Sequence, residues 1–221
     1  METPQINSLY VKEKSLGQED ATDKNAAELI AMLKNKEVRL ISAMALCGSG
    51  KKAHIQPVVG IMDKLIWDEV EDLAYCLRSF GEDAVPFLIP IASSSRKASA
   101  ACAMRALGLI GGEKAIEALN ERLVTLPSKS EPTEALVEIG NSAVPSLLTL
   151  TVHNKADVRT MAVFALGKIG DKAVLEHIEA ISENDRSEKV QHIANLACSW
   201  LRGEESCGWD LRNSFGELPV N

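Results

Sequence analysis

The chain has 221 residues, with 24 basic and 31 acidic side chains and a formal charge of −7 at pH 7. Its basic residues do not gather in one region, which argues against a dedicated nucleic-acid binder, because phosphates are bound by clustered Lys and Arg. Hydrophobic residues make up 46% of the chain but aromatic residues only 4%, which favours close-packed helices over a β-sandwich or barrel. The uncharged stretches are too short for a membrane span and the charged N-terminus is unlike a secretory signal, so we expect a cytoplasmic protein.

From about residue 22 onward one pattern recurs every 30 residues or so, which is the sign of a repeat protein. In each copy, apolar residues at i, i+3, i+4 and i+7 predict a short amphipathic helix, named here the A helix. Prolines near the first turn mark several helix starts, at Pro57, Pro86 and Pro145. The predicted repeats span about residues 22–50, 51–81, 82–111, 112–140, 141–170 and 171–202.

A second apolar run follows each A helix and ends in glycine, most clearly over residues 106–111, 135–140 and 165–170. It predicts a B helix whose terminal glycine adopts a left-handed cap. In the last repeat Arg202 stands at the glycine position, so the pattern fades towards an end cap. A hairpin of two such short helices cannot bury both apolar faces alone, and stacking of hairpins is the stable solution. The sequence therefore predicts an all-α solenoid.

The sequence motif of the repeats resembles that of a known family. Asp157-Val-Arg159 ahead of residues 165–170, followed by Asp171-Lys-Ala-Val, is similar to the short, phycobilisome-lyase-like form of the HEAT repeat. The resemblance covers about residues 22–202 and implies a right-handed α-solenoid of about six HEAT-like helical hairpins. It also implies a ladder in which Asp and Arg of neighbouring repeats hold the stack together.

Only two repeats keep the arginine that the family carries on its B helix, Arg39 and Arg159. We expect both to form hydrogen bonds between repeats rather than to bind an anion. Other residues stand at the matching places, namely Ala100, Lys129 and Gln191.

Three segments lie outside the regular pattern. Residues 1–21 are expected to form a mobile polar extension, and residues 203–221, with Trp209 and Phe215, a tail that can fold back as an end cap. Two prolines and two serines interrupt residues 125–132, which predicts a shortened B helix starting near Ser130 and acting either as a hinge or as part of a degenerate repeat.

The sequence contains no motif that supports catalysis. The four histidines fall in different repeats and no nucleophile elbow is present. Residues 48–52, Gly-Ser-Gly-Lys-Lys, lack the full phosphate-loop pattern, and we interpret them as a helix cap. We therefore expect no catalytic residue and no cofactor.

The five cysteines are odd in number and follow no CxxC or zinc-type spacing. We interpret those inside apolar helical patterns as small core residues, which are Cys47, Cys76, Cys102 and Cys198. A metal site formed by His192, Cys198 and Cys207 is the alternative, but no metal is expected.

The resemblance implies that the B helices line a concave face, and the register counted back from the glycines gives the side chains that point into it. The predicted partner-binding residues are Ile41, Met44, Tyr75, Arg105, Leu109, Met161, Phe164, Lys168 and Trp200. Such enrichment in aromatic residues and Met is typical of protein interfaces. We predict that this strip binds a protein or peptide and that the chain is an interaction scaffold or adaptor. The alternative is that the flanking tails bury these residues.

Two other functions follow from the resemblance. Phycobilisome-lyase-like repeats imply a bilin lyase, or a bilin-handling subunit acting on phycobiliproteins. HEAT-like proteins that bind DNA use a basic concave face, whereas here Glu71, Asp72, Glu134 and Glu138 outnumber Arg105 and Lys168 on the predicted strip. We therefore expect neither nucleic acid nor membrane among the partners.

Overall fold

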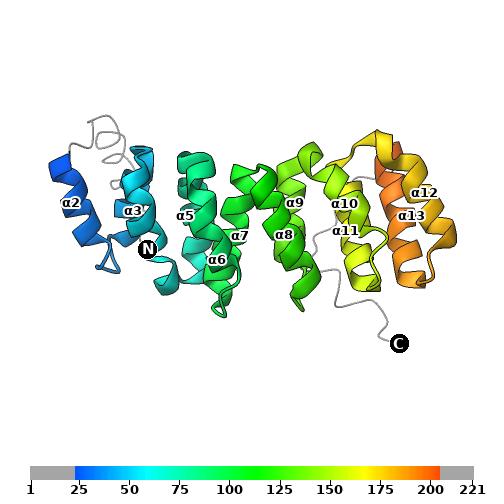
Figure 1. Ribbon diagram of the computed structural model, residues 1–221, viewed down its shortest axis with the longest axis horizontal. Helices are drawn as coiled ribbons and strands as arrows, with labels where there is room; N and C mark the ends of the chain where they lie inside the picture. The colour runs from blue at the N-terminus through cyan, green and yellow to red at the C-terminus, as the bar shows by residue number, and fades with distance from the viewer. Residues whose placement is uncertain (1–22, 205–221) are drawn as a thin grey trace, which may run out of the picture. The chain divides into compact units, whose positions relative to one another are not determined.

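The computed structural model describes residues 23–204. The predicted N-terminal extension, and all but the first two residues of the C-terminal tail, lie outside the described residues. The described part consists of α-helices, short 3₁₀ helices and turns, with no strand among them, as Figure 1 shows. The predicted all-α fold is therefore confirmed. The chain divides into two compact units between Ala106 and Leu107, inside helix α7 (Lys97–Ile110), and not within residues 125–132.

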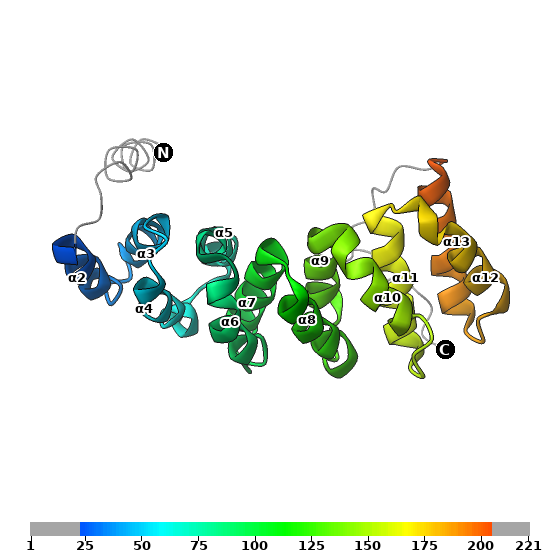
Figure 2. The same ribbon diagram turned by 45° about the horizontal axis from the view of Figure 1, so that its top comes forward.

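The first unit is built from short helices ahead of α7. In chain order they are α2 (Asp23–Met32), α3 (Arg39–Gly48), η1 (Lys52–His54), α4 (Ile55–Val59), η2 (Met62–Lys64), η3 (Trp67–Glu69), α5 (Val70–Leu77), η4 (Arg78–Ala84) and α6 (Val85–Ala92). Figure 2 shows α3 and α5 side by side, with α4 and α6 as the neighbouring pair of A helices. Leu46, Leu73 and Leu88 are fully buried between the two rows, and burial of each leucine contributes about 1.5–3 kcal/mol.

The second unit continues from the end of α7. It contains α8 (Glu113–Thr125), α9 (Ser130–Ile139), η5 (Gly140–Ala143), α10 (Val144–Leu150), α11 (Ala156–Ile169), η6 (Lys172–Val174), α12 (Leu175–Asn184) and α13 (Glu188–Arg202). Helices α8 and α9, α10 and α11, and α12 and α13 pack as hairpins, and α11 also contacts α9 and α13. This stacking of hairpins is the solenoid arrangement that the repeat pattern predicts. Helix α9 has 10 residues, against 14 in both α7 and α11, but α3 also has 10 and α5 has 8, so α9 is not unusually short among the B helices.

Glycines with positive φ follow the B helices, but Gly81 and Gly140 depart from the predicted left-handed cap, because their ψ angles are −146° and −141°. The terminal glycines of the first five repeats have φ between 55° and 79°, a region that a residue without Cβ occupies at no steric cost; they are Gly50, Gly81, Gly111, Gly140 and Gly170. The expectation for the last repeat was wrong, because Arg202 is the final helical residue and Gly203 forms a left-handed cap one position later. A glycine with positive φ thus follows the B helix in all six copies.

Two further glycines allow B helices of the second unit to approach closely. A Cβ atom on Gly108 would lie 2.9 Å from the Cα and carbonyl oxygen of Ala135, and one on Gly167 would lie 2.7 Å from the Cβ of Ala197. Both separations are shorter than van der Waals contact. These contacts fix the spacing of α7 against α9 and of α11 against α13.

Among the described residues, no helix combines the length and the apolar character that crossing a bilayer requires.

Candidate partner-binding surface

The predicted strip contains one large aromatic side chain that faces solvent, Tyr75 on α5. Tyr75 is 52% exposed. The guanidinium carbon of Arg105, on α7, lies 5.8 Å from the centroid of the Tyr75 ring, within the range of a cation–π contact. The Nε of Arg105 also donates to Glu71 Oε2 at 3.1 Å. The structure therefore brings Tyr75 and Arg105 together, and the arginine holds the ring in place.

Two apolar residues of the strip lie on the neighbouring helix α3. Ile41 and Met44 are both half-buried, and α3 packs directly against α5. On α5 itself, Glu71 and Asp72 are exposed beside Tyr75. This face of the first unit, defined by Ile41, Met44, Glu71, Asp72, Tyr75 and Arg105, is named the Tyr75 face below.

In the second unit the strip is more deeply buried than predicted. Phe164 is 1% exposed and Met161 is 8% exposed, so the prediction that both face solvent was wrong. Phe164 meets the ring of Trp200 edge to face, with centroids 5.6 Å apart and planes at 89°, and Lys168 Nζ lies 5.9 Å from the Phe164 centroid. The physical reason is that α11 packs against helices on several sides, so that its residues 158–167 are all buried.

The other predicted residues of the second unit remain partly accessible. Leu109, Lys168 and Trp200 are half-buried. Trp200 covers Phe164, and its Cε3 atom would lie 2.9 Å from a Cβ placed on Gly167. These three side chains are therefore partly committed to packing within the unit.

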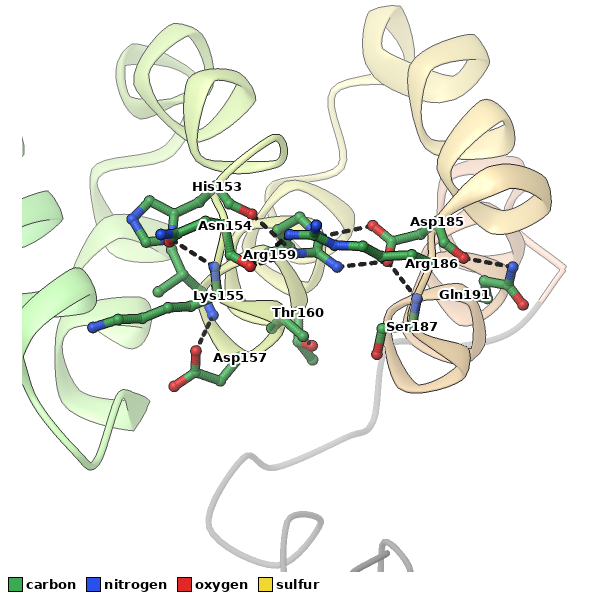
Figure 3. Close-up of polar contacts among 12 residues, drawn as sticks. His153, Asn154, Lys155, Asp157, Arg159, Thr160, Asp185, Arg186, Ser187 and Gln191 are labelled. Carbon is green, nitrogen blue, oxygen red and sulfur yellow. Dashed lines mark hydrogen bonds and ion pairs between the residues drawn. The ribbon is translucent and has the colours of Figure 1, made fainter.

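The family arginine of the fifth repeat binds an aspartate of the next repeat (Figure 3). Arg159 donates from Nε and Nη2 to Asp185 Oδ2 and Oδ1, both at 2.8 Å, and from Nη1 to the carbonyl oxygen of His153 at 2.9 Å. The side chains of Arg159 and Asp185 are only 4% and 9% exposed. The hydrogen bonds from Arg159 lower the pKa of Asp185 below its ordinary value, and the backbone N–H of Ser187 acts in the same direction.

Other neighbouring repeats are also joined by ion pairs, which are formed by different residues. Arg39 Nη2 lies 2.7 Å from Glu69 Oε2 in the first unit. In the second unit Lys129 is buried, donates from Nζ to the carbonyl oxygen of Leu126 at 2.6 Å and lies 3.3 Å from Asp157 Oδ2. Lys129 thus takes the role of the family arginine, and Arg39, Lys129 and Arg159 are structural residues.

The lowered pKa of Asp185 predicts a stability change in acid. Because the folded carboxyl is more acidic than the unfolded one, the pair stabilises the fold above the ordinary aspartate pKa of about 3.9, and this contribution is lost as the pH falls below that value. We expect the free energy of unfolding to fall more steeply below pH 5 in the wild type than in Asp185→Asn. Urea denaturation at pH 3–7 measures both curves, and parallel curves would contradict the assignment.

Sequence reasoning missed one exposed apolar pair, Ile66 and Trp67, between η2 and α5. Trp67 is 58% exposed, and the two residues border a shallow pocket with Arg96 and Lys97. The signal was present, because neither residue belongs to the apolar spacing of an A or B helix. Trp67 therefore provides a matched control for the Tyr75 face.

Three cysteines of the first unit lie on neighbouring B helices. Cys47, Cys76 and Cys102 lie on the successive B helices α3, α5 and α7. Cys47 and Cys102 are buried, whereas Cys76 is partly exposed, and burial raises the pKa of the Cys102 thiol above its ordinary value.

The described residues contain no group of three or more His, Cys, Asp or Glu side chains placed to hold a metal ion. Cys198 is buried on α13, whereas His192 is exposed on the same helix. Cys207, the third member of the alternative metal site, lies outside the described residues.

Comparison with known proteins identifies the repeats. A family model described as HEAT repeats matches residues 129–199, and one described as PBS lyase HEAT-like repeat matches residues 103–125. The comparison with curated protein sequences gives no match.

Several solved structures are similar to this chain. Human deoxyhypusine hydroxylase in complex with glycerol is 19% identical, with a TM-score of 0.45 over 88% of this chain and 80% of that one. The complex of CpcE and CpcF of phycocyanin lyase from Nostoc sp. PCC7120 is 18% identical, with a TM-score of 0.41 over 91% of each chain. A designed armadillo repeat protein in complex with a (KR)4 peptide is 17% identical, with a TM-score of 0.39 over 79% of this chain and 98% of that one. The two family models show that this chain contains HEAT-type repeats, over residues 103–125 and 129–199.

Proposed function

We propose that the protein binds a protein or peptide partner on the Tyr75 face and acts as an interaction scaffold without catalysis of its own. The observation that carries the proposal is the exposed Tyr75 ring, held by Arg105 at 5.8 Å. Tyr and Arg are among the residues that dominate binding energy at protein interfaces. A ring that is already held in place loses less conformational freedom when a partner binds.

The surroundings of Tyr75 indicate the chemistry of the partner. Ile41 and Met44 offer partly accessible apolar surface, and methionine adapts to varied partners. Asp72 is exposed and Glu71, which pairs with Arg105, keeps 63% of its side chain accessible. An acidic rim attracts basic partners and steers their approach. The favoured partner is therefore a segment that carries Lys or Arg beside an apolar side chain.

In the second unit, Leu109, Lys168 and Trp200 keep part of their surface accessible. Met161 and Phe164 have no part in the proposal because they are buried.

Photo-crosslinking tests the proposal at the level of single residues. We expect p-benzoyl-L-phenylalanine in place of Tyr75 to form discrete adducts in a native lysate, identified by mass spectrometry. The same group in place of Val152, which is 79% exposed on the second unit, serves as the control for accidental contact. We expect Asp72→Lys to weaken the adducts at position 75, because it removes acidic charge from the rim.

Two outcomes would remove the proposal. One is the same set of adducts at positions 75 and 152, which would show contact without specificity. The other is strong labelling with the group in place of Trp67 and none in place of Tyr75, which would move the interface to the Ile66–Trp67 pair.

A bilin-handling role is the second candidate, favoured by the match of residues 103–125 to the PBS lyase HEAT-like repeat. Fold-level likeness does not establish an activity. The test is the visible absorption of free phycocyanobilin mixed with the protein. A shifted and intensified band would support the role, whereas an unchanged spectrum with a phycobiliprotein acceptor also present would remove it.

A further inference from the structure

Two apolar side chains of the first unit are adjacent in sequence and both exposed. Ile66 is 46% exposed and Trp67 is 58% exposed; Ile66 precedes η3 and Trp67 begins it. Apolar side chains exposed singly are ordinary, whereas a cluster of them marks a surface that binds a partner. Beside this pair lies an open pocket of about 350 Å³, which Arg96 and Lys97 also line.

The backbone that carries the apolar pair is held from two sides. The N–H of Ile66 donates to Glu69 Oε2 at 3.1 Å, and the same oxygen lies 2.7 Å from Arg39 Nη2. From the other side, Arg96 donates from Nη2 to the carbonyl oxygen of Leu65 at 3.3 Å, and Leu65 itself is buried. An ordered segment thus presents the pair, and such a segment loses little conformational freedom when a partner binds.

The charged groups that line the pocket are both cationic. Arg96 and Lys97 are exposed, and in the part of the chain that the structure describes no carboxylate forms an ion pair with either. The exposed Asp68 follows Trp67 but is not part of the pocket lining, and Glu69 is bound by an arginine of its own. The pocket therefore combines apolar surface with positive charge, and it complements a negatively charged partner.

We propose that this pocket, named the Trp67 pocket, binds a protein segment in which Asp or Glu stands beside an aromatic or aliphatic side chain. The apolar side chain packs on Ile66 and Trp67, and the carboxylate binds Arg96 and Lys97, since arginine pairs well with carboxylates. A volume of about 350 Å³ is at the lower end for small-molecule sites. It suits one or two side chains of a peptide better than a cofactor.

Nucleic acid is the other anionic partner that binds to aromatic and basic side chains together. Phosphate backbones are bound by many cations, whereas this pocket offers two, on a chain with a formal charge of −7. The charges therefore favour an acidic protein segment.

The inference goes beyond the proposed function and does not depend on it. Glu71 and Asp72 make the Tyr75 face acidic, and that face favours a basic segment. The two exposed aromatic side chains of the first unit, Tyr75 and Trp67, therefore select segments of opposite charge, which excludes each partner from the other surface.

Selection from a phage-displayed library of random dodecapeptides on the full-length protein tests the proposal. Peptides that also bind Trp67→Ala are removed at each round. We expect the enriched sequences to carry Asp or Glu next to an aromatic or aliphatic residue. No enrichment, or enrichment of sequences rich in Lys and Arg, would overturn the proposal. Sequences that match this chain itself would assign the pocket to a segment of the same protein and overturn a separate partner.

Fluorescence anisotropy of the most enriched peptide, labelled with fluorescein, tests the two cations. We expect Arg96→Glu/Lys97→Glu to weaken binding at least about tenfold, as when an interface anchor is lost. The matched control is Lys114→Glu/Lys172→Glu, which makes the same change in net charge at exposed lysines of the second unit and should bind like the wild type. Equal weakening in both double variants would reveal a general charge effect and overturn the assignment to the pocket.

Tyr75→Ala separates this inference from the proposed function. It should leave peptide binding at the Trp67 pocket unchanged, whether or not the Tyr75 face has a partner. A loss in Tyr75→Ala as large as in Trp67→Ala would contradict a separate pocket. A labelled oligouridine that binds more tightly than the peptide, and is lost in Arg96→Glu/Lys97→Glu, would assign the pocket to nucleic acid instead. Far-ultraviolet circular dichroism shows that each variant keeps its helices.

Discussion

Replacing Arg159 with leucine is expected to lower the free energy of unfolding by about 3–5 kcal/mol, the usual cost of removing one partner of a buried ion pair. The variant leaves the Asp185 carboxylate, whose side chain is 9% exposed, without its bidentate partner. It also removes the donor to the carbonyl oxygens of His153 and Asn154. Urea denaturation followed by circular dichroism measures the loss.

Two further variants isolate the cause of this loss. Arg202→Leu makes the same substitution in an exposed pair with Glu179, and exposed pairs contribute little, so its stability should be almost unchanged. The double variant Arg159→Leu/Asp185→Leu should recover part of the loss, because no buried charge is left unpaired. Equal losses in Arg159→Leu and Arg202→Leu would show that the buried pair has no special role.

Replacing Gly167 with alanine is expected to destabilise the second unit by about 1–3 kcal/mol, the range for overpacking a well-packed core. In an ordinary helix interior the same change stabilises by about 1 kcal/mol, so the sign of the effect tests the packing. The added methyl would lie 2.7 Å from the Cβ of Ala197 and 2.9 Å from Trp200 Cε3. Since neither the α13 backbone nor the Trp200 ring can yield easily, the helices must move apart.

The control is Gly48→Ala on α3, where a Cβ meets nothing within 4 Å. Its stability should be unchanged or slightly higher. The compensating double variant Gly167→Ala/Ala197→Gly should regain most of the loss, because it removes the methyl that the new one strikes. A Gly167→Ala protein more stable than the wild type would contradict the close approach of α11 and α13.

The fold could be predicted because each repeat carries the same signals, which are apolar spacing along two helices and a glycine after the second one. Terminal glycines such as Gly111 and Gly170 mark positions with φ of 73° and 79°, and Pro86 and Pro145 lie in the first turns of α6 and α10. The ladder of ion pairs between neighbouring repeats could be predicted only in part from the sequence. Arg39 and Arg159 match the family, but the sequence does not reveal that Lys129 performs the same task from a buried position.

The candidate surface was harder to predict, because exposure depends on how many neighbours a helix has. A register assigns one face of α11 to solvent, yet Met161 and Phe164 are buried. Residues 160–167 contain no charged side chain, and a helix that is uncharged all round is typical of the interior. That signal could have corrected the prediction.

The most direct measurement of the central claim is the affinity of a partner identified by crosslinking at position 75, determined by isothermal titration calorimetry. The Tyr75 face predicts that Tyr75→Ala weakens binding by at least 2 kcal/mol, or about 30-fold, as at interface hot spots. Trp67→Ala removes an aromatic ring of the first unit that is slightly more exposed than Tyr75, at 58% against 52%, and this variant should bind like the wild type. Unchanged binding in Tyr75→Ala together with a large loss in Trp67→Ala would contradict the account.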